Sequence, residues 1–251
     1  MACKKLYFFG FRYECPFCHS YLRSLLPFGL NFPVLKEKRV VGGGYRLDCL
    51  CPICNSFDRE RLLYLYLANQ TDVFEKPAKL LHVAPEERLK NLLCSKTNLD
   101  YLTADLFQKT VMVKMDITDI QFPENSFDII LCNHILEHVI DDRKAMAELY
   151  RVLKPGGWAI LQVPMSLSLS NTYEDSSITS PADRETAFGQ NDHVRIYAGD
   201  YLTRLADAGF NVDVFKWTDD MKNFGGTGNR YGLNEDECVY RANKKQTLRK
   251  D

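Results

Sequence analysis

The chain has 251 residues, of which 45% are apolar and 26% charged, and its formal net charge is −1. A chain of this length forms one large domain, or one domain with a small companion, and buries a core without covalent help. The composition excludes a collagen, a disulfide mini-protein and a low-complexity disordered chain, and no apolar run reaches the ~18 residues of a membrane span. The near-neutral charge argues against a nucleic-acid coat protein.

The N-terminal part of the chain holds a cysteine pattern typical of a zinc site. Cys15-Pro-Phe-Cys18 and Cys51-Pro-Ile-Cys54 are two matching C-x-x-C turns. Each such turn aims two thiolates at one point, so two turns supply the four sulfur ligands of a closed tetrahedral zinc site. The 32 residues between the two turns make the middle loop longer than usual. We therefore predict a zinc-ribbon-like module with structural Zn²⁺, and ordinary reduced thiols are the competing interpretation.

Charge and periodicity also set this segment apart. Residues 1–61 carry 10 Lys and Arg against 5 Asp and Glu, a net charge of +5. A basic module can bind RNA or an acidic substrate. RNA binding would favour exposed aromatic residues interleaved with a basic run, which we do not expect here. We therefore interpret the positive charge as an ordinary solvated surface. Apolar residues at helical spacing in 58–68 predict a helix that packs onto the next domain. Cys49 and His19 are weaker alternative metal ligands. We place the module at residues 1–70 and a second domain at residues 71–251.

From about residue 78 the pattern alternates between strands and helices. We expect strands at 79–83, 101–104, 111–115, 127–132 and 158–163, helices at 86–95 and 143–154, and later a helix at 200–208 and strands at 211–217 and 237–242. This alternation predicts a mostly parallel sheet that is covered by helices. Such a sheet binds its ligands at the carboxyl ends of its strands.

Polar residues gather where these strands end. The residues at successive strand ends are His82 and Glu86, then Asp105, then Asp116, then Asn133 and His134. Asp105 lies 19 residues after Glu86, close to the ~20-residue spacing at which an acidic side chain accepts hydrogen bonds from a ribose diol. One acidic residue could be an ordinary cap, but acidic residues on successive strands favour a binding site.

Three segments resemble class I S-adenosylmethionine-dependent methyltransferases, and in particular the group of the ubiquinone and menaquinone methyltransferases. They are residues 116–128 (DITDIQFPENSFD), 133–139 (NHILEHV) and 148–157 (ELYRVLKPGG). The resemblance covers roughly residues 78–217, and the whole chain resembles a bacterial subgroup of methyltransferases with an N-terminal zinc-ribbon-like module. It implies an α/β fold with a Rossmann-like seven-stranded sheet, and methyl transfer from S-adenosylmethionine to an oxygen, nitrogen or sulfur nucleophile.

The resemblance also implies which residues hold the cofactor. Asp105 would bind the ribose hydroxyls, and Asn133 and His134 would line the wall near the methionine part. Leu106 would pack on the adenine ring. The Asp116 carboxylate would accept a hydrogen bond from the adenine amino group, and the backbone of Ile117 would lie nearby.

The turn after the first strand departs from the family pattern. The family has a glycine-rich turn there, whereas this chain reads His82-Val-Ala-Pro-Glu86. Ala84 is small enough to allow a close approach of the backbone to the cofactor. Glu86 could accept a hydrogen bond from the cofactor's ammonium group, so we retain His82, Ala84 and Glu86 as cofactor-binding candidates.

Residues 165–199 form a long segment without a clear element, and in this fold such an insertion covers the acceptor. His193 is a candidate general base because the ordinary pKa of histidine lies near 6.5. Arg195 could bind an anionic group, and Tyr173 could pack on or hydrogen-bond the acceptor. The alternative is a polar network that orders the loop. His138 faces either the active site or a helix start.

The favoured function is methyl transfer to a small-molecule acceptor, with S-adenosylhomocysteine as product. The alternatives are an RNA or protein methyltransferase that uses the zinc module to hold a macromolecule, and a cofactor-binding domain without catalysis. We expect a cytoplasmic protein without a membrane span. The sequence leaves open the acceptor, its reacting atom and the oligomeric state.

Overall fold

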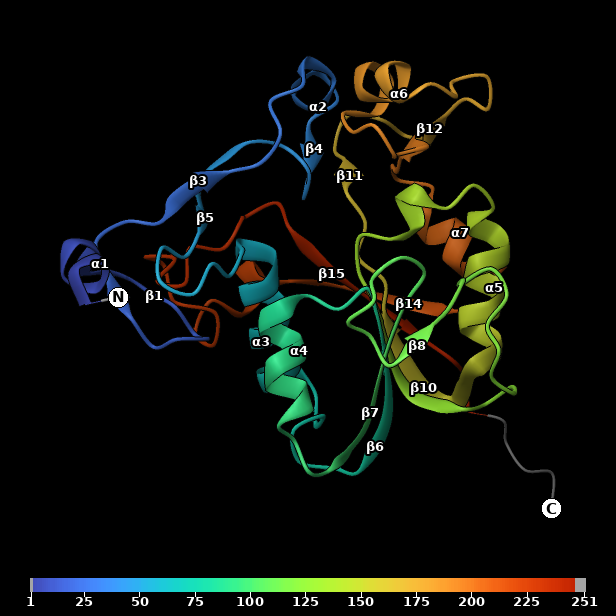
Figure 1. The fold of residues 1–251 in the computed structure, drawn as a ribbon, viewed down its shortest axis with the longest axis horizontal. Helices are drawn as coiled ribbons and strands as arrows, with labels where there is room; N and C mark the ends of the chain where they lie inside the picture. The colour runs from blue at the N-terminus through green and yellow to red at the C-terminus, as the bar shows by residue number, and fades with distance from the viewer. Residues whose placement is uncertain (1, 247–251) are drawn as a thin grey trace.

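The computed structural model describes residues 2–246, and its central feature is a sheet of seven strands in the order β14-β15-β10-β9-β6-β7-β8 (Figure 1). The strands are β6 (Ala78–Val83), β7 (Leu99–Asp105), β8 (Val113–Lys114), β9 (Phe127–Cys132), β10 (Leu153–Ile160), β14 (Asn211–Lys216) and β15 (Cys238–Asn243). Strand β15 runs antiparallel to both of its neighbours, and the other pairs are parallel. The predicted Rossmann-like α/β sheet is therefore confirmed.

Two layers of helices cover this sheet. Helices α3 (Asp58–Gln70) and α4 (Glu87–Cys94) pack with Leu80 of β6, while α5 (Asp142–Val152) and α7 (Tyr201–Asp207) pack with its neighbour Leu81. Successive side chains of a strand point to opposite faces, so adjacent leucines serve two different cores. The predicted packing of the 58–68 helix on the second domain is confirmed, because α3 lies beside α4 on the sheet.

Some element boundaries differ from the prediction. Strand β10 begins at Leu153 instead of residue 158, because residues 153–157 continue in an extended conformation with a shift of register before Trp158. The Asp141 carboxylate caps α5 by accepting from the Lys144 N–H. Two short 3-10 helices, η1 (Leu136–His138) and η2 (Trp217–Asp220), complete the domain. No helix in residues 2–246 is long and apolar enough to cross a membrane.

The segment 165–199, where the sequence indicated no element, holds three short strands and a helix. They are β11 (Met165–Ser166), β12 (Tyr173–Glu174), α6 (Pro181–Phe188) and β13 (Arg195–Ile196). The Ser180 hydroxyl caps α6 by accepting from the Asp183 N–H, and Gly189 ends the helix with a φ of 82°. This is the usual combination of an N-terminal serine cap and a left-handed glycine at the C-terminus.

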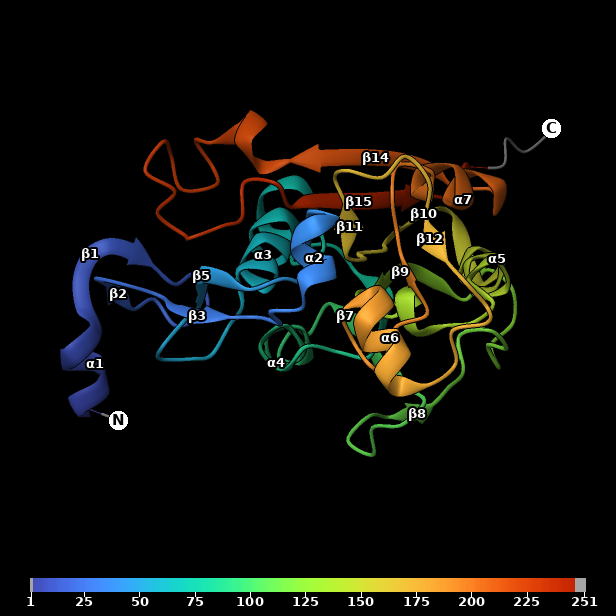
Figure 2. The same ribbon diagram turned by 90° about the horizontal axis from the view of Figure 1, so that it is seen from above.

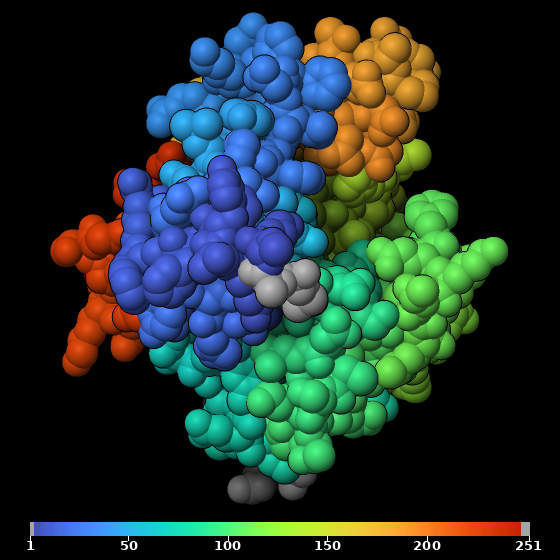
Figure 3. Space-filling view, turned by 60° about the vertical axis from the view of Figure 1, so that its left-hand side comes forward, coloured from blue at the N-terminus to red at the C-terminus, as the bar shows by residue number. Residues whose placement is uncertain are grey.

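The N-terminal residues form a small module with a long arm. The module contains α1 (Ala2–Phe8), β1 (Phe9–Glu14), β2 (Tyr21–Leu22), β3 (Leu26–Phe28) and β5 (Arg46–Leu50), and the arm carries α2 (Pro33–Glu37) and β4 (Val40–Val41). The arm reaches the 165–199 insertion, where β4 pairs antiparallel with β11 and α2 packs against α6 (Figures 1 and 2). The Ser166 hydroxyl also donates to the Lys38 carbonyl at 2.6 Å. The arm and the insertion thus form one cover (Figure 3).

Candidate functional site

The four predicted zinc ligands lie together. Cys15, Cys18, Cys51 and Cys54 place their sulfur atoms within 4.8 Å of one another. The Cys15–Cys54 sulfurs are 3.5 Å apart and the Cys18–Cys51 sulfurs 3.8 Å apart. A tetrahedral zinc site with bonds of about 2.3 Å spaces its sulfurs by about 3.8 Å, so the cluster has the size of such a site.

The two C-x-x-C turns have the same backbone geometry. The N–H of His19 donates to the Cys15 carbonyl, and the N–H of Asn55 donates to the Cys51 carbonyl. His19 and Asn55 both have positive φ angles, 52° and 60°, which turn the chain back after the second cysteine. The alternative ligands lie elsewhere: His19 is exposed, and the Cys49 thiol is held by Arg46 and Asp58.

Three of the predicted cofactor-binding residues form one hydrogen-bonded group at the ends of β6 and β9. The Glu86 carboxylate lies 2.9 Å from His82 Nε2, and Asn133 Nδ2 donates to it at 3.3 Å. Burial alone would raise the pKa of Glu86, but the hydrogen bond and the charge of His82 outweigh burial and lower this pKa. Glu86 is therefore an ionised acceptor at neutral pH.

Asp105 lies at the end of β7, the strand next to β6. One carboxylate oxygen, Oδ1, accepts from the N–H groups of Phe107 and Gln108, at 2.6 and 2.8 Å. These two bonds fix the orientation of a carboxylate that is only 8% exposed. The other oxygen, Oδ2, is held by this orientation at the carboxyl edge of the sheet.

The predicted adenine contacts occupy the next part of the same edge. Leu106 is 37% exposed, so its side chain is accessible for packing on the adenine ring. Asp116 is exposed and accepts from the Thr118 N–H and hydroxyl through Oδ1. The Ile117 side chain is buried in the core, which leaves its backbone for a contact.

Ala84 occupies the position where the resembling family has glycine. Its φ is 45°, in the left-handed region that glycine enters at no steric cost. The turn therefore keeps a glycine-like backbone with an alanine side chain. His134, at the end of β9, also has a positive φ of 55°. Both strand ends thus turn sharply, which brings their backbones to the carboxyl edge of the sheet.

A cavity of about 210 Å³ lies between this edge and the cover. Its lining includes the predicted residues His134, His138 and His193 together with Glu137 and Arg59. The N-terminal arm contributes Gly42 and Gly43 to the opposite wall. The cavity is therefore lined by residues from three distant parts of the chain.

Burial sets the protonation of the groups in this cavity. It lowers the pKa of His193 to about 4 and that of His138 below its usual value. It also lowers the pKa of His134 well below the usual value, and the nearby Arg59 acts in the same direction. All three imidazoles are therefore neutral at pH 7 and able to accept a proton. Burial raises the pKa of Glu137 to about 8.

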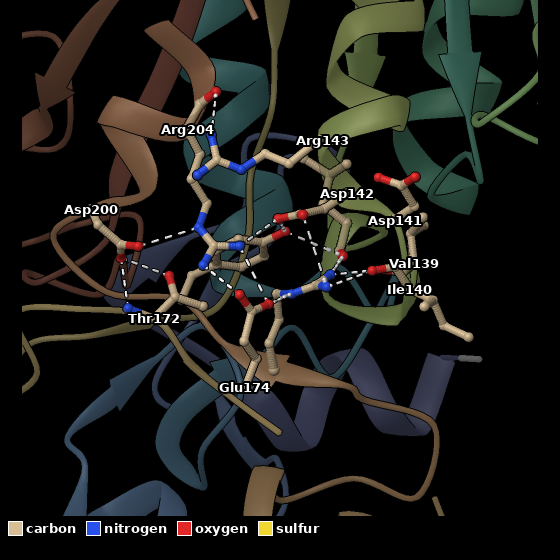
Figure 4. A network of polar contacts seen from close by, with 12 residues as sticks. Val139, Ile140, Asp141, Asp142, Arg143, Thr172, Glu174, Asp200 and Arg204 are labelled. Carbon is tan, nitrogen blue, oxygen red and sulfur yellow. Dashed lines mark hydrogen bonds and ion pairs between the residues drawn. The ribbon is translucent and has the colours of Figure 1, made fainter. Parts of the chain in front are cut away.

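Arg195 lies in a buried polar network beside the cavity. Its guanidinium pairs with Glu174 at 2.8 Å and donates to the carbonyls of Leu136, Val139 and Ile140. Figure 4 shows this network, in which Glu174 also pairs with Arg204 of α7. These contacts agree with the alternative in which Arg195 orders the insertion.

Tyr173 belongs to the cover. Its ring packs 5.4 Å from that of Phe188, between ring centroids, and the Lys38 ammonium lies 4.7 Å above it. Tyr173 therefore joins the arm to the insertion and does not line the cavity described above.

Sequence reasoning missed Arg59 and gave no role to Glu137. Arg59 is in the first turn of α3, donates to the Gly42 carbonyl at 3.2 Å and lines the cavity. The helical periodicity of residues 58–68 predicted which face of the helix is packed. It did not indicate that Arg59, on another face, lines a cavity. Glu137 was visible only as one polar residue of the NHILEHV segment.

Comparisons with known proteins find similarities in the larger domain. Residues 78–161 match the family model described as a methyltransferase domain. The ubiquinone/menaquinone biosynthesis C-methyltransferase of Escherichia coli O1:K1 is 29% identical over 120 residues, which cover 42% of this chain and 48% of the relative. The demethylmenaquinone methyltransferase of Clavibacter sepedonicus is 31% identical over 102 residues, which cover 41% of this chain and 40% of the relative. The chain thus spans less than half the length of either relative.

A solved structure supports the fold. The [4+2]-cyclase SpnF has a TM-score of 0.52 and 17% identity to this chain, over 76% of this chain and 84% of that chain. At this identity the similarity concerns the fold alone. Residues 78–161 thus match a methyltransferase domain, and the strand order around them is that of a Rossmann-like sheet.

Proposed function

We propose that this protein is an S-adenosylmethionine-dependent methyltransferase that transfers a methyl group to an oxygen, nitrogen or sulfur atom of a small-molecule acceptor. The observation that carries the proposal is the set of Glu86, Asp105 and Asn133 at the ends of three neighbouring strands. S-adenosylmethionine supplies a methyl group that its sulfonium has already activated. The chain then needs to bind, orient and shield the reacting groups.

The strand-end residues fit this cofactor. The side chain of Asn133 is 5% exposed, and its Oδ1 is among the buried polar atoms of residues 2–246 that have no hydrogen-bond partner. A buried acceptor without a donor costs free energy, so a ligand donor such as an ammonium group would stabilise it. The ionised Glu86 carboxylate, which is hydrogen-bonded to Asn133, offers a second acceptor for the same group.

The remaining candidates suit the acceptor side. His193 is neutral and 7% exposed, and its burial among His138 and Glu137 gives it a place in a water-poor cavity. A neutral imidazole there can remove a proton from an acceptor hydroxyl. Arg59, a permanent cation in the same cavity, favours an acceptor with an anionic group.

The zinc ion would have a structural role. Four cysteine sulfurs complete a tetrahedral site and leave no open position for a substrate. The four sulfurs belong to the N-terminal module and the His-rich cavity has its own residues, so methyl transfer and zinc binding use separate sites. We also propose residues 1–70 as this module and 165–199 as the acceptor-covering insertion.

The assignment of Asp105 can be tested by the affinity for S-adenosylhomocysteine. Asp105→Ala removes the carboxylate proposed to accept from the ribose hydroxyls, which should raise Kd by about ten- to a hundredfold, or about 1.4–2.8 kcal/mol. Asp100→Ala, at the exposed start of the same strand, is the matched control and should leave Kd unchanged. Equal Kd values for the two variants in calorimetry would remove Asp105 from the site.

A macromolecular acceptor is the second candidate, and one observation favours it. Contrary to the expectation from sequence, the N-terminal module exposes aromatic rings beside basic groups. Phe9, Phe11 and Tyr21 are 54%, 80% and 43% exposed and lie in a row, with ring centroids 5.2 and 6.1 Å apart. The Arg23 guanidinium lies 4.4 Å from the exposed Tyr7 ring. Bases of single-stranded RNA stack on such rings.

Salt dependence separates the two candidates. An RNA complex releases counterions, so its affinity falls steeply as salt rises. Fluorescence anisotropy with a labelled single-stranded RNA should show binding at low salt that Phe11→Ala weakens, if RNA is the acceptor. The small-molecule proposal predicts weak RNA binding that this substitution does not change.

A further inference from the structure

Three side chains in the cavity have the composition of a metal centre with open positions. Glu137, His138 and His193 each offer one ligand atom, and these atoms lie within 4.8 Å of one another. Two imidazoles and one carboxylate leave coordination positions free for other ligands. The four-cysteine cluster is a different site, with different residues and a closed ligand set.

The backbone brings these residues together from distant parts of the chain. Glu137 and His138 lie in η1, directly after β9, and His193 lies in the insertion. The N–H of Val194 donates to the Glu137 carbonyl at 2.9 Å, which holds the insertion against η1. The rings of His138 and His193 then meet edge to face, with their centroids 4.6 Å apart.

The carboxylate of Glu137 is incompletely satisfied. Its side chain is 2% exposed, and Oε2 has no hydrogen-bond partner among the residues that the structure describes. The other oxygen, Oε1, lies 3.5 Å from His134 Nδ1 and 4.0 Å from His138 Nε2. A buried carboxyl oxygen without a hydrogen-bond partner is costly, and a bound cation would supply the missing partner.

His138 is held as a metal-binding histidine is held. Its Nδ1 lies 3.2 Å from the Asp192 carboxylate, while Nε2 faces Glu137. A carboxylate that accepts from one ring nitrogen leaves the lone pair of the other nitrogen free for a metal and fixes the orientation of the ring. Asp192 comes directly before His193, so the insertion supplies both a ligand and the residue that orients another ligand.

We propose that Glu137, His138 and His193 bind one divalent transition-metal ion whose open positions face the cavity. Bonds of about 2.0–2.2 Å space the ligand atoms by about 3.3–3.6 Å, so a bound ion would draw the three side chains closer together. The metal site itself is independent of the proposed function. Its use does rest on that function: the open positions would hold an oxygen atom of the methyl acceptor, either a hydroxyl or a carboxylate.

This site narrows the class of acceptor. With the ion bound, His193 would serve as a ligand instead of the base. A metal-bound hydroxyl loses its proton to solvent more readily than a free one, because the cation stabilises the oxygen anion. Arg59 adds a second positive charge to the wall of the cavity, and its Nε is another buried polar atom with no partner in residues 2–246. The geometry therefore favours an acceptor with two oxygen donors, such as a vicinal diol or a hydroxy acid.

Cobalt binding tests the site without requiring the acceptor. Co²⁺ is titrated into the full-length protein with zinc already bound, by calorimetry and visible absorption. We expect one equivalent of Co²⁺ with bands of a nitrogen- and oxygen-ligated ion and no thiolate charge transfer. His193→Ala and Glu137→Gln should each weaken binding at least tenfold, and Asp192→Asn about tenfold. Glu87→Gln, at an exposed position away from both metal sites, is the matched control.

Two results would overturn the metal site. One is no Co²⁺ uptake beyond the cysteine cluster at millimolar metal, and the other is equal affinity in the ligand variants and their control. Thermal unfolding identifies a variant that fails to fold, and Asp192→Asn then carries the test alone because it keeps all three ligands. S-adenosylhomocysteine binding is measured separately, so failure of the proposed methyl transfer and failure of the metal site are distinguishable.

Discussion

At the scale of single residues, the strand ends carry backbone conformations that are costly for side chains other than glycine. Ala84 and His134 both have left-handed φ angles, and each follows a strand of the parallel sheet. A residue with a Cβ pays roughly 1–2 kcal/mol for this conformation. Such strained positions persist where the surrounding structure holds them, and they gather at functional sites. The same two residues flank the proposed cofactor and acceptor positions.

The sequence predicted which residues lie at the strand ends more completely than which residues line the cavity. Asp105 and Asn133 follow recognisable strands, and the carboxyl ends of parallel strands always meet at one edge. Arg59 and Gly42 reach the cavity only because the N-terminal arm folds over the sheet. No local pattern encodes that approach, so these residues were not predictable from spacing.

Glu237 gives the stability of the fold a testable pH dependence. Burial raises the pKa of Glu237 to about 7, and the charge of Asp58 acts in the same direction. A carboxyl with a raised folded pKa stabilises the fold fully below its unfolded pKa of about 4.3, and this contribution is lost as the pH rises through 7. Glu237→Gln should therefore be more stable than the wild type at pH 8, by about 3 kcal/mol.

The measurement for Glu237 is urea unfolding at pH 4 and pH 8. The gain from Glu237→Gln should vanish at pH 4, where the wild-type carboxyl is protonated in both states. Glu235→Gln, at an exposed position two residues away, is the matched control. A gain of the same size at both pH values would contradict a buried, pH-dependent carboxyl.

At the scale of elements, the cover depends on the contact between the arm and the insertion. Strands β4 and β11 each have two residues, and they exist because they pair with each other. The two strands lie more than 100 residues apart in the sequence, which explains why no strand was predicted at residues 165–166. The long strands and helices of the sheet were predictable, since their apolar patterns are local.

Gly189 lies at a close contact between the two parts of the cover. A Cβ at this position would lie 2.5 Å from Leu35 of α2, and φ is 82°. Gly189→Ala should therefore destabilise the protein through both backbone strain and a clash between α6 and α2, by about 2–4 kcal/mol. Thermal unfolding measures this loss.

Gly226 separates the two causes. It also has a positive φ, 69°, but a Cβ there meets nothing within 4 Å. Gly226→Ala should thus cost only the backbone strain, about 1–2 kcal/mol. If both variants lose the same stability, the contact between α2 and α6 contributes nothing to the fold.

At the scale of the whole molecule, the N-terminal module is fastened to the sheet domain by a buried arginine. Arg61 of α3 is fully buried, and it donates to the carbonyls of Cys49 and Ser56 on the module side. On the other side it donates to the carbonyls of Tyr231 and Gly232. The loop between η2 and β15 therefore docks against the module. Arg61 thus links the module that carries the zinc cluster to the sheet domain.

Loss of zinc should consequently affect the whole chain. Cys51→Ser removes one of four thiolate ligands and should reduce bound zinc from about one equivalent to near zero. It should also lower the thermal unfolding temperature, because the module loses the ion that organises its two turns. Cys94→Ser, at an exposed position in α4, is the matched control. Metal analysis that still finds one equivalent in Cys51→Ser would contradict the four-cysteine site.

We propose above all that the carboxyl edge of the sheet binds S-adenosylmethionine beside the cavity that receives the acceptor. A crystal structure of the full chain with S-adenosylhomocysteine tests it most directly. The account predicts ribose hydroxyls at Asp105, the amino group at Glu86 and Asn133, and the sulfur atom facing the cavity lined by His134. An empty strand edge at millimolar S-adenosylhomocysteine, or the ligand bound elsewhere, would contradict it.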